Sequence, residues 1–128
     1  MRRQELLYQP GRQFRLIMWE AALLAGLAPP DVLATQMDRL TSVIGLDTVR
    51  LGVVPIGAPL AVPPGNGFWL YDDRLAIVEE WHVELWLNDT DSVALYRRVW
   101  ETLDKAAVYG TQARRIIGRV RVHFADLA

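Results

Sequence analysis

The side chains best placed for acid–base chemistry in this sequence are His82 and Glu84. They are two residues apart in a stretch that alternates polar and apolar residues, so on a strand both would point to the same face. Such a pair can act as a general base with its partner, as in a small hydrolase, or can bind a metal ion. No third metal-ligating residue stands at a spacing that is typical of a metal site. We therefore interpret the pair as part of a strand face that is exposed to solvent.

The other charged clusters predict surface charge and not catalysis. Glu79, Glu80 and Glu84 form an acidic group, and carboxylates on strands more often deter edge pairing than do acid–base work. The sequence contains no Gly-x-Ser-x-Gly, HExxH or phosphate-loop motif. We therefore expect no enzyme activity, no catalytic residue, no cofactor and no bound metal.

The composition predicts one folded domain in a reducing compartment. Hydrophobic residues make up 52% of the 128 residues, which is sufficient for a sizeable core. The 14 basic and 15 acidic residues nearly balance, which argues against non-specific binding of nucleic acid by the whole domain. The chain has no cysteine and no apolar run of the roughly 20 residues that span a bilayer. We expect a single cytoplasmic domain, residues 1–128, without a membrane segment.

Hydrophobic periodicity predicts the elements that would position these residues. Helical spacing predicts a short helix at the N-terminus, a helical turn near 21–26, and longer helices that begin near 30, 92 and 111. The predicted apolar stripes are Leu33, Met37, Leu40 and Ile44 on the helix that begins near 30, and Ala113, Ile117, Val120, Phe124 and Leu127 on the helix that begins near 111. Alternation predicts strands over 13–20, 49–53, 68–71, 75–79 and 81–87. We expect an α+β fold with about four to five strands in a mixed or mostly antiparallel sheet, packed by helices, with a C-terminal helix pair.

A proline-rich apolar loop joins two of these strands and is the strongest candidate for a contact surface. Ile56, Leu60 and Val62 alternate there with prolines, which cannot sit inside a central strand. An apolar loop with little conformational freedom is better suited to binding a partner than to catalysis. We therefore predict that these three residues bind a partner protein.

Five tryptophans provide a second set of candidate residues. Tryptophan is enriched at interface hot spots, so we predict Trp69 and Trp86 as further partner-binding residues. Alternatively, aromatic residues between the sheet and the helices could line a pocket for an apolar or aromatic small molecule. That pocket would be lined by Trp19, Trp69, Tyr71 and Trp81.

The order of motifs along nearly the whole chain, from about Arg3 to Val120, resembles one family. The motifs are Glu20-Ala21-Ala22-Leu23, Gln36-Met37-Asp38-Arg39-Leu40, Val53-Val54-Pro55-Ile56, Gly67-Phe68-Trp69-Leu70 and Tyr96-Arg97-Arg98-Val99-Trp100. The resemblance is to the C-terminal domain of unknown function found behind a Cro/cI-type (Xre-family) helix-turn-helix domain in bacterial transcriptional regulators. Trp19 stands where the family usually has Asp, and Ile56 where it usually has Phe.

The resemblance implies a regulatory or protein-interaction domain that is neither catalytic nor itself DNA-binding. Its expected partner is a small protein encoded nearby or a second copy of the chain. DNA contact is expected only through a helix-turn-helix domain that this sequence lacks. The small-molecule sensor described above is the alternative hypothesis.

Overall fold

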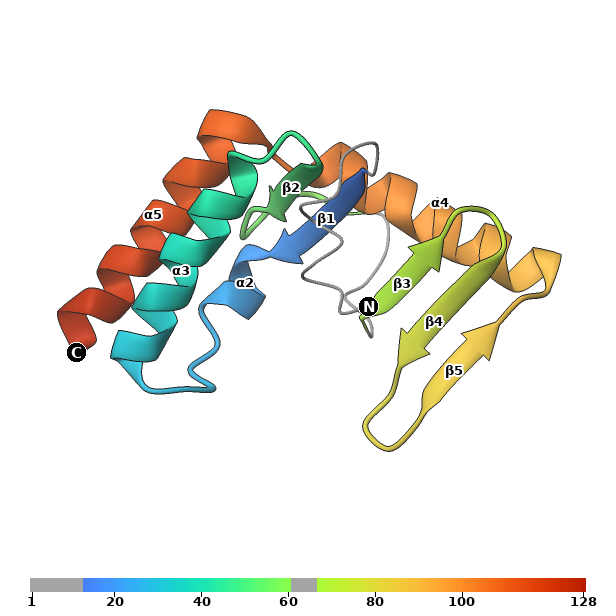
Figure 1. Cartoon of the computed structure of the whole chain (residues 1–128), viewed down its shortest axis with the longest axis horizontal. Coiled ribbons are helices and arrows are strands. Elements are labelled where there is room, and N and C mark those ends of the chain that lie inside the picture. Colours follow the sequence, from blue (N-terminus) through green and yellow to red (C-terminus); the bar gives the residue numbers. More distant parts are fainter. Residues whose placement is uncertain (1–12, 61–66) are drawn as a thin grey trace. The chain divides into compact units, whose positions relative to one another are not determined.

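The computed structural model describes residues 13–60 and 67–128, which fall into two compact units (Figure 1). The first unit holds the described residues up to Ala58 together with residues 106–128, and the second holds residues 59–105. The expected α+β class is confirmed, and the described residues form five strands and a C-terminal pair of helices. The helix predicted at the N-terminus lies outside the described residues.

The first unit is built on two parallel strands joined by a helical crossover. Strand β1 (Phe14–Trp19) pairs with β2 (Val49–Val54), and Phe14 lies opposite Val49. Parallel strands need a long connection, which here contains the short helix α2 (Glu20–Leu23) and the longer helix α3 (Pro30–Ile44).

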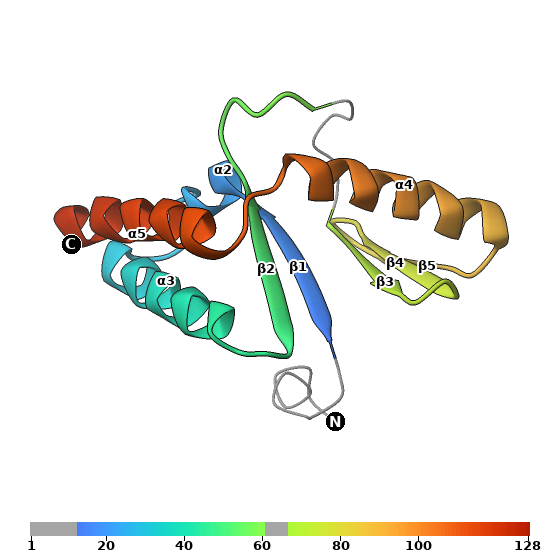
Figure 2. The same ribbon diagram turned by 90° about the horizontal axis from the view of Figure 1, so that it is seen from above.

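Two long helices cover one face of this strand pair. Helix α5 (Gly110–Leu127) lies antiparallel beside α3, as both views show (Figures 1 and 2). Their apolar stripes meet the inward side chains of β1 and β2, as the periodicity predicts. The buried core contains Leu23, Leu33, Met37, Val49, Leu51, Val53, Ala113, Ile116, Ile117, Val120 and Phe124.

The second unit is an antiparallel sheet with one helix. Its strands lie in the order β3, β4, β5, with bounds Phe68–Tyr71, Leu75–Glu79 and Glu84–Leu87. Helix α4 (Thr90–Ala106) packs on one face, where the rings of Phe68 and Tyr96 lie 5.0 Å apart. Val78 lies opposite both Phe68 and Leu85, so the side chains of these three residues share the face that the helix covers.

Two features differ from the expected sheet. The strands of the described residues form two sheets, and the second edge of β2 pairs with Val108 through hydrogen bonds of 2.9 and 2.8 Å between Val53 and Val108. The last strand begins at Glu84 and not at Trp81. Trp81 and His82 instead form the tip of a hairpin, which the hydrogen bond from the Glu80 N–H to the Val83 carbonyl closes.

Asp89 caps α4 at its N-terminus. Its carboxylate accepts a 2.9 Å hydrogen bond from the Ser92 N–H, and its carbonyl accepts one from Val93. The Ser92 backbone N–H, and after it the Ser92 hydroxyl, hold the pKa of the Asp89 carboxyl below its ordinary value of 3.8.

We predict that Asp89→Ala lowers the free energy of unfolding at neutral pH and that this loss becomes smaller in acid. A carboxyl whose pKa is lowered by folding stabilises the fold fully above the unfolded-state pKa, and that stabilisation is lost as pH falls through the folded-state pKa. Urea denaturation of both proteins over a pH series measures the difference. Asp89→Asn, which can still accept the capping hydrogen bond, is the control. A difference that stays constant down to the lowest pH would contradict a carboxylate cap.

Candidate contact site

The chain that leaves β2 makes a tight turn, Pro55 to Ala58, that presents Ile56. The Ala58 N–H donates a 3.2 Å hydrogen bond to the Pro55 carbonyl, which closes the turn. Gly57 has φ of 83°, the left-handed conformation that a type II turn requires at this position and that glycine adopts without strain. The Ile56 side chain is 62% exposed, so the turn holds a large apolar group in solvent.

Glu20, the first residue of α2, fixes this turn to the body of the first unit. Its Oε1 accepts a 3.0 Å hydrogen bond from the Ile56 N–H, and its Oε2 lies 3.9 Å from a guanidinium nitrogen of Arg119 on α5. The Glu20 side chain is only 13% exposed, whereas that of Arg119 is largely in solvent. A mostly buried carboxylate therefore holds the backbone of Ile56 in place while the Ile56 side chain stays outside.

Glu20 is the functional candidate that reasoning from the sequence missed. The two motifs Glu20-Ala21-Ala22-Leu23 and Val53-Val54-Pro55-Ile56 are far apart in the chain and meet through this hydrogen bond. The place of Glu20 in the first of these motifs was the available signal. Nothing in the spacing identified Ile56 as its partner.

The other two residues predicted on the apolar loop are placed differently. Leu60 is partly buried and belongs to the second unit. Val62 lies outside the described residues. Of the three loop residues predicted to bind a partner, Ile56 is thus the one that the structure shows as a presented apolar side chain.

The two tryptophans predicted as partner anchors do share one surface. Trp69 on β3 and Trp86 on β5 both lie opposite Ile77 of β4, so all three side chains are on the same face of the sheet. This face is opposite to the one that α4 covers, because neighbouring residues of a strand point to opposite faces. Ile77 is buried, whereas Trp86 is 65% exposed.

Carboxylates hold both indoles on this face. The Trp69 Nε1–H donates to Glu79 Oε1 at 2.7 Å, and the Trp86 Nε1–H donates to Glu84 Oε2 at 3.3 Å. Glu79 and Glu84 lie directly opposite each other on β4 and β5, where like charges repel. The sheet therefore carries two indoles and two neighbouring negative charges on its face away from α4. We call Trp69, Ile77, Glu79, Glu84 and Trp86 the indole face.

The residues predicted to line a ligand pocket belong to different units. Trp19 ends β1 in the first unit, whereas Trp69, Tyr71 and Trp81 belong to the second. Tyr71 is 42% exposed, and Trp81 at the hairpin tip is fully exposed. A side chain surrounded by solvent cannot form the wall of an enclosed pocket.

The pair with the clearest potential for acid–base chemistry is not assembled for it. His82 lies at the hairpin tip, outside β5, and both His82 and Glu84 are exposed. Glu84 instead accepts the hydrogen bond from Trp86. Among the described residues, no group of three His, Asp or Glu side chains is close enough to hold a metal ion.

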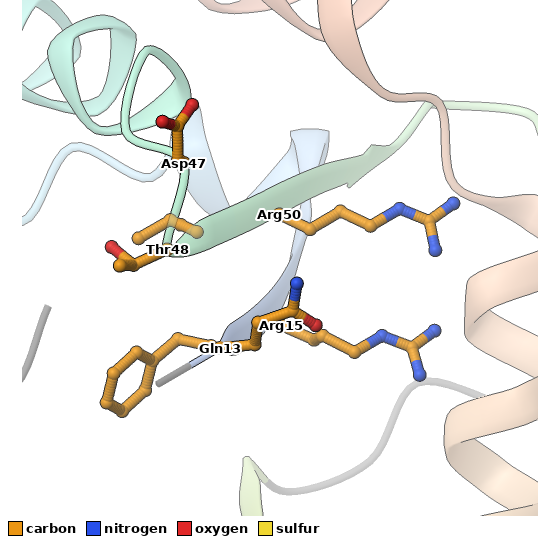
Figure 3. Close-up of a pocket in the computed structure, with 7 residues that line it drawn as sticks. Gln13, Arg15, Asp47, Thr48 and Arg50 are labelled. Atoms are coloured by element: carbon orange, nitrogen blue, oxygen red, sulfur yellow. The ribbon is translucent and has the colours of Figure 1, made fainter. Parts of the chain in front are cut away.

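A pocket of about 330 Å³ lies where β1 and β2 begin (Figure 3). The guanidinium groups of Arg15 and Arg50 extend in the same direction there, and the carboxylate of Asp47 points away from them. Arg50 also lies over the ring of Tyr109, 4.0 Å from its centre. The charged side chains of this pocket are exposed, so the depression offers no water-excluded site for catalysis.

The chain thus has an α+β fold and exposes apolar and aromatic side chains to solvent. The backbone that carries these side chains is held in place by hydrogen bonds. A family model with the description "Domain of unknown function (DUF5753)" matches residues 1–119. The chain therefore belongs to this family, and the matched residues include both units. No curated protein and no solved structure matches the chain. None of the described helices is both long enough and apolar enough to cross a membrane.

Proposed function

We propose that this chain is the protein-interaction domain of an Xre-type transcriptional regulator, and that the Ile56 turn is one of its contacts. The observation that carries the proposal is the exposed Ile56 side chain on a turn that Glu20 ties to the unit. An apolar residue held in place before binding loses less conformational entropy when a partner covers it. Such a residue is suited to serve as an anchor.

The assignment to a regulator rests on the resemblance of the motif order to domains that follow a Cro/cI-type helix-turn-helix. The proposed partner is a small protein encoded nearby or a second copy of the chain, in the cytoplasm. The domain would act without catalysis, by changing the association of the regulator with that partner. The sensor hypothesis is supported by no comparable observation, since Trp81, one of the four residues predicted for its pocket, is fully exposed.

We predict that Ile56→Asp weakens binding to the partner at least about tenfold, the loss expected when an interface anchor worth more than 1 kcal/mol is removed. The partner is first identified by placing a photo-crosslinking amino acid at position 56 in the native host. Its dissociation constant for the purified chain is then measured by calorimetry.

Val32 on α3 supplies the matched control, because it is an exposed apolar residue of the same unit, 42% accessible. A crosslinker at position 32 should not capture the same protein, and Val32→Asp should change the affinity by less than about twofold. Equal effects of the two substitutions, or no crosslinked protein at position 56, would contradict the role of the turn.

A further inference from the structure

Strand β5 (Glu84–Leu87) lies at the edge of its sheet and contains three large apolar residues. Within residues 67–105 it pairs with β4 on one side and with no strand on the other. Proteins commonly protect such edges with lysine, proline or a bulge, because free backbone groups accept another strand. Strand β5 instead consists of Glu84, Leu85, Trp86 and Leu87, and three of these four side chains are exposed.

The hairpin geometry identifies the backbone groups that face outward. Glu80 and Val83 are the hydrogen-bonded pair that closes the hairpin, because the Glu80 N–H donates to the Val83 carbonyl. Hydrogen-bonded and non-hydrogen-bonded pairs alternate along an antiparallel ladder. Leu85 and Leu87 therefore bond inward to β4, and the N–H and C=O groups of Glu84 and Trp86 point away from the sheet. An additional strand would hydrogen-bond to these two residues.

The side chains of the same two residues define what the additional strand would meet. Glu84 and Trp86 both lie on the indole face, and Val83 and Leu85, 44% and 42% exposed, point to the opposite face. A lysine or arginine opposite Glu84 would form a cross-strand ion pair and reach the face of the Trp86 indole. Apolar residues at the alternate positions would cover Val83 and Leu85.

The acidic excess of the second unit indicates which kind of segment would bind at this edge. Residues 59–105 contain nine acidic and four basic side chains, whereas the rest of the chain contains six acidic and ten basic ones. A second copy would bring the same acidic excess to the edge, so its β5 would be repelled. We propose that β5 binds an extended cationic segment of a partner protein as an added strand, with basic residues alternating with apolar ones.

This surface is separate from the Ile56 turn, so either proposal can fail without the other. The probe is a synthetic peptide that alternates lysine or arginine with valine over seven residues. Its counterpart carries glutamine at every basic position. Binding of each to the 128-residue chain is measured by fluorescence anisotropy at low and moderate salt. We expect the cationic peptide to bind more tightly than its counterpart, and more weakly as salt rises.

Two substitutions at Trp86 separate the backbone from the side chain. Both Trp86→Val and Trp86→Pro remove the indole, and neither removes a hydrogen bond to β4. Only proline also removes the N–H that points outward. We expect Trp86→Pro to bind the peptide at least about threefold more weakly than Trp86→Val, the effect of one lost hydrogen bond. Glu84→Gln should weaken binding of the cationic peptide and leave the glutamine peptide unaffected. Circular dichroism establishes that the variants are folded.

Hydrogen exchange on the unmodified chain tests the same geometry without any substitution. The amide protons of Glu84 and Trp86 should become at least about fivefold slower to exchange when the cationic peptide is added, because they acquire hydrogen-bond acceptors. Equal binding of the two peptides, or unchanged exchange at both amides, would overturn the proposal. A dimer of the chain that Trp86→Pro dissociates, seen by sedimentation, would assign this edge to a second copy and would also overturn it.

Discussion

Replacing Ile117 by alanine should lower the free energy of unfolding by about 2–5 kcal/mol, the range for large-to-small changes at fully buried sites. Ile117 is 0% exposed and lies at the centre of the stripe that α5 turns toward α3 and the parallel strands. Because helices hold their backbone in place, the surroundings can collapse only partly into the space that the lost methyl groups leave. Guanidinium denaturation followed by circular dichroism measures the change.

The control for this prediction is Val122→Ala in the same helix. Val122 is 54% exposed, so its replacement should change the free energy of unfolding by less than about 0.5 kcal/mol. The two substitutions have similar effects on helix propensity, since both replace a β-branched residue by alanine. A loss below about 1 kcal/mol for Ile117→Ala would mean that α5 does not form the core described above.

Gly52→Ala should be the second most damaging of these substitutions, at about 1–3 kcal/mol, the usual cost of an overpacked site. A Cβ at position 52 would lie 2.6 Å from Tyr109 Cε1, 2.7 Å from its Cζ and 3.1 Å from the Ala107 Cβ. The ring would have to move away, and it would lose its position under the Arg50 guanidinium. Gly52 is thus required in the middle of β2 because an aromatic ring lies against its backbone.

Two controls isolate this steric cause. Gly26→Ala has no atom within 4 Å of the new Cβ and should leave stability unchanged or slightly raised. In a Tyr109→Ala background the cost of Gly52→Ala should fall by at least about 1 kcal/mol, because the colliding ring is gone. An undiminished cost in that background would exclude the contact with Tyr109 as the cause.

Periodicity predicted the helices and the direction of their apolar faces well. The α3 stripe is confirmed in Leu33 and Met37, which are buried, and in Leu40 and Ile44, which are partly buried. On α5 the predicted stripe is confirmed from Ala113 to Phe124. It is wrong at Leu127, which is 60% exposed in the last residue of the helix. It also missed Ile116, because α5 buries a wider strip than a single line of residues.

Strand pairing could not be predicted in the same way. Alternation shows which side chains share a face, but it does not show which strands are neighbours. The pairing of Val53 with Val108, for example, joins residues that are far apart in the sequence. The indole face depends on pairing as well, since Trp69 and Trp86 come together only because both lie opposite Ile77.

The candidate contact residues were only partly predictable for the same reason. Composition identified Ile56, Trp69 and Trp86 as side chains suited to contact. It could not identify Glu20, whose role arises from a hydrogen bond across 36 positions of the chain. Nor could it show that the short turn at Trp81 and His82 would remove the histidine from the strand that holds Glu84.

The bridge between Val53 and Val108 has a consequence for the connectivity of the molecule. The polypeptide departs from the parallel strand pair after Val54 and returns to it at Val108, so the two hydrogen bonds between Val53 and Val108 hold its exit and its re-entry side by side. The second unit, residues 59–105, is therefore topologically an insert in the first, whose removal would leave a gap that a few linker residues can close. The helical scaffold could therefore persist while that insert changes in length and in the side chains that it exposes.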